Sequence, residues 1–255
     1  MENERAIAAL AGALRDARRV VVLTGAGVSA ESGIPTFRDA MTGLWAKFDP
    51  ADLATPEAFE HDPELVTRWY DERRRRCLQC QPNPGHTALA RLESDLEHRG
   101  GKLTLLTQNV DRLHQRAGSR DVVELHGSIM VWRCTETGEE TEPGPEAFAR
   151  FPPPSACGAP MRPAVVWFGE MLPPAALARA HESLEHCDLF LSVGTSSVVQ
   201  PAASFVHVAA LAGAQTGEVN PEETPISGRV DWSVRGKSGD FLARLAEAAF
   251  GPTKP

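Results

Sequence analysis

The chain has 255 residues, 42% of them hydrophobic, which is enough for one large domain or for a large domain with a smaller inserted lobe. Its formal net charge of −8 leaves no general basic face, so composition excludes non-specific nucleic-acid binding. The first twenty residues carry no apolar targeting segment, and no later stretch approaches the roughly 18 apolar residues of a membrane span. We therefore expect a cytoplasmic protein that does not enter a membrane.

Short apolar runs indicate five buried strands, at 20–23, 103–106, 122–125, 189–193 and 216–219. Helix-like stretches lie between or beside them, at 63–76, 86–98, 175–186, 202–212 and 240–250. Because strand and helix alternate, the sequence predicts the α/β class, with a doubly wound, Rossmann-like parallel sheet.

Two regions break this alternation. Residues 34–76 open with a proline-containing loop, and residues 133–163 are rich in Pro, Gly and Glu with little periodicity. We expect these two regions to form a smaller lobe inserted in one domain that spans 1–255. The larger lobe would then consist of residues 1–33, 77–132 and 164–255.

A glycine-rich loop follows the first expected strand. Residues 25–30, GAGVSA, fit the pattern G-x-G-x-x-G/A, in which glycines let the backbone approach a pyrophosphate. Taken alone, this pattern leaves nucleotide binding and an ordinary loop equally open. A dehydrogenase would continue into a helix and a second strand, but Gly33 and Pro35 indicate another loop here. Such a loop suits a reaction at the nicotinamide ribose better than hydride transfer.

Five motifs then occur in one order: GAGVSAESGIPTFRD, TQNVDRLHQRAG, ELHGS, VVWFGE and GTSSVVQP. In this order and with this spacing they resemble the sirtuin family, over nearly the whole chain from about Arg19 to Phe250. The resemblance implies an NAD-dependent deacylase that acts on acylated lysines of proteins or peptides.

The resemblance assigns most of the matched residues to NAD binding. Positions that match the family's cofactor loop are Gly25, Ala26, Gly27, Phe37 and Arg38. Positions that match the polar group around nicotinamide and its ribose are Gln108, Asn109 and Asp111. Those expected to hold phosphate, ribose or adenosine are Gly194, Thr195, Ser196, Asn220 and Ser238, of which Ser238 aligns only through its flanking glycines.

His126 matches the sirtuin general base, although a lone histidine after a strand is more often structural. Its ordinary pKa of about 6.5 suits a base that acts near neutral pH. The implied course is attack of the acyl-lysine oxygen on the nicotinamide ribose, release of nicotinamide, and formation of free lysine and O-acyl-ADP-ribose, with His126 and Asn109 as catalytic residues. The segment that matches the substrate-pairing strand and the walls of the lysine tunnel is Val165, Val166, Trp167 and Phe168. A core strand is the alternative for this segment.

The chain departs from the family in its cysteines. Most sirtuins hold a structural zinc ion with four cysteines in two C-x-x-C pairs, and this region has only Cys134 and Cys157. Thr137 and Pro160 stand where the partner cysteines would be. We therefore expect no structural zinc. The separate pair Cys77 and Cys80 is expected to be two incidental thiols.

Tyr70 and Arg73 share one face of the helix expected at 63–76. By itself, the run Arg73 to Arg76 is typical of a solvated charge cluster. In the sirtuin subclass called class III, however, a Y-x-x-R helix follows an Ala-Thr-Pro stretch, and this chain has Ala54 in ATP before Tyr70. The resemblance thus implies a roomy pocket in which a guanidinium and a phenol bind an acyl carboxylate, as in malonyl, succinyl or glutaryl lysine.

Three other functions remain open from the sequence. The chain could be a plain NAD-dependent deacetylase or, more remotely, a mono-ADP-ribosyl transferase, because both use the same cofactor loop. It could also be an NAD-binding sensor without turnover, although a base such as His126 beside the ribose argues against that function.

Overall fold

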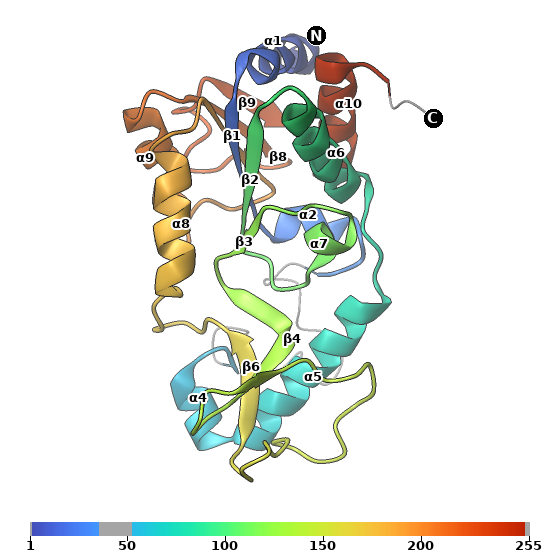
Figure 1. Ribbon diagram of the computed structural model, residues 1–255, viewed down its shortest axis with the longest axis vertical. Helices are drawn as coiled ribbons and strands as arrows, with labels where there is room; N and C mark the ends of the chain where they lie inside the picture. Colours follow the sequence, from blue (N-terminus) through green and yellow to red (C-terminus); the bar gives the residue numbers. More distant parts are fainter. Residues whose placement is uncertain (1, 36–52, 253–255) are drawn as a thin grey trace.

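The computed structural model describes residues 2–35 and 53–252. A six-stranded sheet forms the larger part, and a three-stranded sheet lies at the opposite end of the long axis (Figure 1). Within the described residues, none of the helices combines the length and apolar character that a membrane crossing requires. Phe37 and Arg38 of the expected cofactor loop lie outside the described residues.

All neighbouring strands of the large sheet run parallel, in the order β3-β2-β1-β7-β8-β9. The strands are β1 (Arg19–Thr24), β2 (Lys102–Thr107), β3 (Val122–Glu124), β7 (Leu189–Val193), β8 (Gln215–Asn220) and β9 (Trp232–Arg235). Strands β2 and β3 lie on one side of β1. Strands β7, β8 and β9 lie on its other side. The direction of growth therefore reverses between β1 and β7.

Helices cover both faces of this sheet, so the predicted doubly wound architecture is confirmed. Successive residues of β1 point to opposite faces: Val20 and Val22 belong to one apolar core, and Val21 and Leu23 to the other. The first core is closed by α1 (Glu2–Asp16), α6 (Pro84–His98) and α10 (Ser238–Phe250). The second is closed by α8 (Pro174–Leu184) and α9 (Phe205–Leu211), which Figure 1 shows, and by the short 3-10 helix η2 (Ala202–Ser204).

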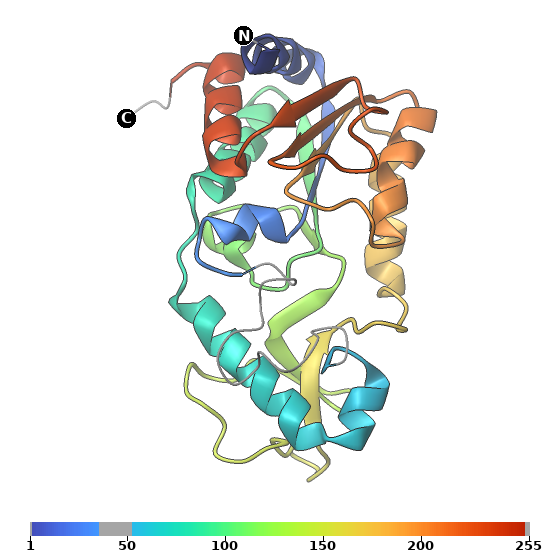
Figure 2. The same cartoon turned by 180° about the vertical axis from the view of Figure 1, so that it is seen from behind.

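The smaller sheet is antiparallel and consists of β4 (Gly127–Cys134), β5 (Glu140–Thr141) and β6 (Met161–Val165). Two helices, α4 (Pro56–His61) and α5 (Pro63–Gln79), accompany it, as the reverse view in Figure 2 shows. A third apolar core, which includes Trp69 of α5 and Trp132 of β4, joins α5 to this sheet. The division into lobes at the boundaries expected from the sequence stays a prediction.

Cap residues determine where the helices near the site begin. Thr55, Asp62 and Asn83 each precede a proline and accept a backbone hydrogen bond from the first turn of α4, α5 and α6, respectively. In α6 the cap is reciprocal, since His86 Nδ1 also accepts from the Asn83 backbone amide at 3.2 Å. The cap therefore constrains His86 as well as the helix start.

Four features differ from the sequence-based expectations. Helix α1 and strand β9 were not expected, and the region 133–163 contributes part of a sheet despite its weak periodicity. The run Arg73 to Arg76 is not uniformly solvated. Arg74 is 1% exposed, because its guanidinium pairs with the buried Asp71 at 2.7 Å and donates to the carbonyl oxygens of Gly144 and Glu146. Arg74 thus links α5 to the segment between β5 and β6.

Candidate active site

Two glycine loops meet at the carboxyl ends of β1 and β7, where the direction of strand addition reverses. Gly27 N donates to Gly194 O at 2.8 Å, and a Cβ on Gly25 or Gly27 would lie 2.8 or 2.7 Å from that same oxygen. Gly194 itself has a φ of +61°. Only glycine permits this approach. The crevice at such a reversal point is where open α/β sheets bind nucleotides, so the loops fit a dinucleotide.

The polar residues after β2 are tied to these loops. Asn109 Nδ2 donates to Gly25 O and to Ser29 Oγ, both at 3.1 Å. Gln108 Nε2 donates to Thr195 Oγ1 at 2.9 Å. Residues that follow β1, β2 and β7 therefore form one connected group at the same edge of the sheet. Ala26 begins the short helix α2 (Ala26–Ala30) in this group, and Ser196 lies exposed beside Thr195.

A buried chain of hydrogen bonds continues from Asn109 through Ser29. Ser29 Oγ donates to Asp111 Oδ2 at 2.7 Å, and His86 Nε2 lies 3.4 Å from Ser29 Oγ. Because His86 Nδ1 accepts from Asn83, the neutral ring carries its proton on Nε2 and can donate it to Ser29. Burial raises the pKa of Asp111, and hydrogen bonds from Leu113 N and Ser29 oppose that rise.

A second buried histidine accompanies His86. The ring centroids of His86 and His114 are 4.7 Å apart, and His114 Nε2 lies 3.0 Å from Thr24 Oγ1. Burial lowers the pKa of His86 to about 4 and that of His114 to about 3. Both rings are therefore neutral near pH 7. Sequence reasoning gave Ser29 and His114 no role, although both lie inside the recognised motifs.

His126 lies between the two sheets, in the junction from β3 to β4. Its Nδ1 is 3.1 Å from Gln108 O, and its own carbonyl accepts from Val166 N at 3.0 Å. Gly127 follows with a φ of +71° and pairs with Val165, and a Cβ there would be 2.1 Å from Ala164 O. Burial lowers the pKa of His126, and the hydrogen bond to Gln108 opposes that shift. The histidine thus touches both the polar group after β2 and the segment 165–168.

An ion pair between Arg162 and Glu170 stabilises the segment 165–168. Arg162 binds Glu170 through two contacts of 2.7 and 2.9 Å, and Glu170 also accepts from Trp167 N at 2.8 Å. The Arg162 guanidinium carbon lies 3.2 Å from the centroid of the Trp167 ring. Trp167 is buried, whereas Phe168 is 46% exposed and its amide donates to Ala54 O at 2.8 Å. Neither Arg162 nor Glu170 was singled out from the sequence.

The expected acyl-pocket residues come together in the third apolar core. Ala54, Tyr70, Val165 and Trp167 all belong to it, whereas Val166 packs against the core beneath α8 and α9. The Tyr70 ring centroid is 6.3 Å from that of Trp167. The structure therefore places Ala54, from before α4, and Tyr70, from α5, beside the segment that follows β6.

Arg73 completes this group from the same helix as Tyr70. Its guanidinium carbon lies 4.5 Å from the ring centroid of Trp69 and 5.4 Å from that of Tyr70. Burial raises the pKa of Tyr70 to about 12, with the charge of Arg73 opposing the rise. The phenol therefore keeps its proton, and with it a hydrogen-bond donor, at neutral pH.

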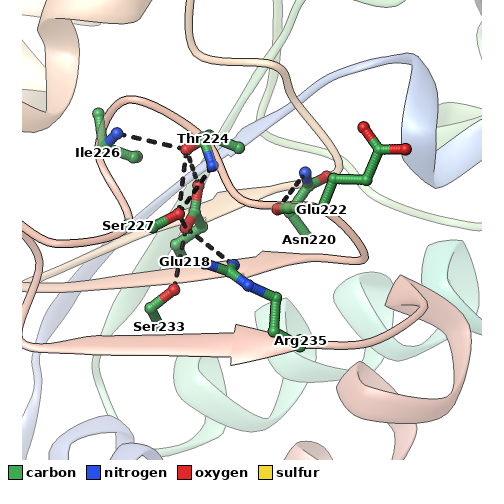
Figure 3. Close-up of polar contacts among 8 residues, drawn as sticks. All are labelled: Glu218, Asn220, Glu222, Thr224, Ile226, Ser227, Ser233 and Arg235. Atoms are coloured by element: carbon green, nitrogen blue, oxygen red, sulfur yellow. Dashed lines mark hydrogen bonds and ion pairs between the residues drawn. The ribbon is translucent and has the colours of Figure 1, made fainter.

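At the carboxyl end of β8, a buried carboxylate organises the loop that follows. Glu218, 1% exposed, accepts from Ser227 Oγ at 2.5 Å and from Ser233 Oγ at 3.0 Å, and it also binds Thr224 and Arg235 (Figure 3). Asn220 lies two residues further along β8 and donates to Glu222 O at 2.9 Å. The sequence singled out Asn220 but not Glu218.

Ser238 is the first residue of α10. Its hydroxyl donates to Glu31 Oε1 at 3.3 Å, and the same oxygen accepts from Gly239 N at 3.0 Å. The hydroxyl is thus bound to a carboxylate in this structure. A cofactor contact of Ser238 stays a prediction.

Among the residues that the structure describes, no group of three or more His, Cys, Asp or Glu side chains is placed to hold a metal ion. The expectation of a zinc-free protein stays a prediction that requires metal analysis.

Comparison with known proteins points to one family. A family model described as the Sir2 family matches residues 25–201. An NAD-dependent protein deacylase of Methylococcus capsulatus is 49% identical over 94% of this chain and 95% of its own. One of Thermus thermophilus is 51% identical over 91% of each chain. A crystal structure of a Sir2 homologue with NAD superposes with a TM-score of 0.86 at 46% identity, covering 94% of this chain and 93% of that one.

Proposed function

Because the chain belongs to the Sir2 family, and is an NAD-dependent enzyme that deacylates proteins, we propose that it prefers acyl-lysine groups that end in a carboxylate. Succinyl, malonyl and glutaryl groups are the candidates. The observation that carries the proposal is Arg73, whose guanidinium stacks beside the Tyr70 phenol at the wall of the core that also contains Ala54 and Trp167.

NAD, when bound, supplies a ribose carbon that can accept the acyl oxygen and a ribose hydroxyl that can lose a proton. We assign the base to His126. Its Nδ1 faces the Gln108 carbonyl, which can only accept, so the neutral ring carries its proton there and leaves the Nε2 lone pair free. His126 then takes the hydroxyl proton at Nε2.

We assign the orientation of the ribose to Asn109 and Asp111. The two Nδ2 hydrogen bonds of Asn109 fix its side chain, so its amide oxygen has one direction. Asp111 is 3% exposed and held by Ser29 and by the Leu113 amide. Side chains held in this way need little reordering when they bind a ligand, which favours catalysis by positioning.

The acyl pocket combines one cation with one neutral donor. A carboxylate without partners would be costly to bury, whereas a guanidinium offers two charge-assisted hydrogen bonds and the protonated Tyr70 a third. Stacking on Trp69 and Tyr70 preorganises Arg73, so less side-chain entropy is lost on binding. Acetyl-lysine is too short to reach either partner. The pair therefore distinguishes acidic acyl groups from acetyl.

The test compares kcat/KM for succinyl-lysine and acetyl-lysine peptides of one sequence in three variants. Arg73→Met and Tyr70→Phe should lower desuccinylation about 10- to 100-fold, because a hydrogen bond to a charged group contributes about 1.5 to 3 kcal/mol. Deacetylation should stay near its original level. Arg68→Met is the matched control, since Arg68 lies on the same helix but pairs with Glu64 at the surface. An equal loss of both activities in the two pocket variants would assign them a structural role instead.

A further inference from the structure

Two thiols outside the active site approach each other closely. Cys134 is the last residue of β4, and Cys157 lies in the turn before β6. Their sulfur atoms are 3.5 Å apart, although 23 positions separate them in the sequence.

Both cysteines are held in place by their own turns. Ser155 N donates to Ala159 O at 2.8 Å and so closes the turn around Cys157. On the other side, the Thr137 amide donates to Cys134 Sγ at 3.4 Å. Strand β4 ends at Cys134 and pairs with β6, and Cys157 lies in the turn before β6. This pairing places the two sulfur atoms close together, so the thiols need little movement to react.

The two thiols differ in their access to solvent. Cys157 is exposed, so a small molecule in solution can reach its sulfur. Cys134 is buried, and hydrogen bonds, chiefly from Ser155 and Thr137, lower the pKa of its thiol to about 6. Near neutral pH a large fraction of Cys134 is thus the nucleophilic thiolate.

Two other cysteines lack these properties. Cys77 and Cys187 are buried, and desolvation raises the pKa of their thiols to about 12 and about 11. The surroundings of Cys134 and Cys157 also lack a metal-ligand set within the described residues, because no third His, Cys, Asp or Glu completes the group. A close dithiol without such a set is suited to oxidation.

We propose that Cys134 and Cys157 are a reversible oxidation site that forms an intramolecular disulfide by exchange with a low-molecular-weight disulfide such as oxidised glutathione. The Cys157 thiolate attacks one sulfur of the small disulfide, whose S–S bond breaks, and one small thiol leaves with a proton. The Cys134 thiolate then attacks Cys157 Sγ and releases the second small thiol. Two protein thiols lose two electrons, and one small disulfide is reduced to two thiols.

Trypsin provides a direct readout, because Arg133 and Arg150 flank a peptide that contains Cys134 alone. The following peptide begins at Phe151 and contains Cys157 alone. Full-length protein treated with oxidised glutathione should yield these two peptides joined, without glutathione, in the mass spectrum. Dithiothreitol should separate them.

Single variants test the order of the steps. Cys134→Ser should keep one glutathione on Cys157, because the resolving thiolate is gone. Cys157→Ser should give no linked pair and little adduct on the buried Cys134. The double change Cys77→Ser with Cys80→Ser is the matched control, and it should leave the linked pair at its original yield.

Three outcomes would overturn the proposal. One is the absence of the linked pair after glutathione treatment, and another is independent glutathione adducts on both cysteines of the wild-type protein. The third is about one equivalent of zinc in chelator-free protein that is lost in Cys134→Ser, which would make the thiols metal ligands.

Discussion

The imidazole Nδ1 of His126 lies 3.1 Å from the main-chain carbonyl oxygen of Gln108. The carbonyl cannot donate, so this contact selects the tautomer in which Nε2 is unprotonated. The Gln108 side chain meanwhile binds Thr195 in the loop after β7. One residue thus orients the proposed base and connects it to the nucleotide loops.

His126→Ala should abolish deacylation while leaving NAD binding largely intact, because the base acts after the cofactor is seated. The expected loss of kcat is about 10²- to 10⁴-fold, as for removal of a general base. Turnover assays and NAD titration by calorimetry measure the two effects. His186→Ala, at an exposed position, is the control and should change neither. Near-normal turnover of His126→Ala would remove this histidine from the mechanism.

The acid limb of the pH profile should lie below the ordinary histidine pKa of about 6.5. Burial lowers the pKa of His126, so the neutral form required of a base persists to lower pH. We expect the midpoint of the acid limb of kcat/KM for an acetyl-lysine peptide to lie below pH 6.5. The acetyl peptide is chosen because its acyl group does not titrate. A midpoint well above 6.5 would contradict the prediction.

The buried pair His86 and His114 should destabilise the fold as the pH falls below about 6.5. In the unfolded chain both rings bind protons near that pH, whereas the folded pKa values of about 4 and about 3 delay protonation. Between these limits the unfolded state holds more protons, so the free energy of unfolding decreases by about 1.4 kcal/mol per pH unit for each histidine.

Urea unfolding at a series of pH values measures this slope. His86→Asn offers its side-chain oxygen in place of Nδ1 as acceptor for the Asn83 amide and removes one titrating group. Its slope between pH 4 and 6.5 should be smaller than that of the wild type by up to about 1.4 kcal/mol per pH unit. An unchanged slope would mean that His86 is protonated in the folded protein or that other groups govern acid unfolding.

Glu218→Gln should weaken NAD binding more than it slows turnover. The charged carboxylate accepts hydrogen bonds from Ser227 and Ser233 and so holds the loop that follows Asn220. A neutral amide binds these hydroxyls less strongly, and we expect the KM for NAD to rise about 10-fold with kcat at saturating NAD nearly unchanged. Glu222→Gln, in the exposed part of the same loop, is the control. Equal KM values for NAD in both variants would limit Glu218 to a structural role.

Much of the larger sheet could be predicted from the sequence because its strands are buried on both faces. Runs such as VVVL at 20–23 have no polar residue, and a parallel strand covered by helices on both sides tolerates that composition. The order of five motifs likewise predicted the family and its cofactor, both of which the comparisons confirm.

Strand β9 and the small sheet escaped prediction for a physical reason. In β9 only Val234 is buried, because an edge strand packs on one side alone. In β6 a proline interrupts the run Met161–Val165, and in β4 the register shifts between Ser128 and Trp132, so neither strand shows a clean period of two. Helix α1, by contrast, carries a helical pattern of apolar residues in Ile7, Leu10 and Leu14.

By itself, the sequence determined which residue types are present and in what order, and hence the fold class, the family and most of the proposed site. Only the tertiary structure decided which side chains meet. Arg73 stacks on the pocket aromatics while its neighbour Arg74 is buried against Asp71, although both belong to one run of arginines. Likewise Cys134 approaches Cys157, because contacts between residues distant in sequence depend on strand pairing, which no local pattern encodes.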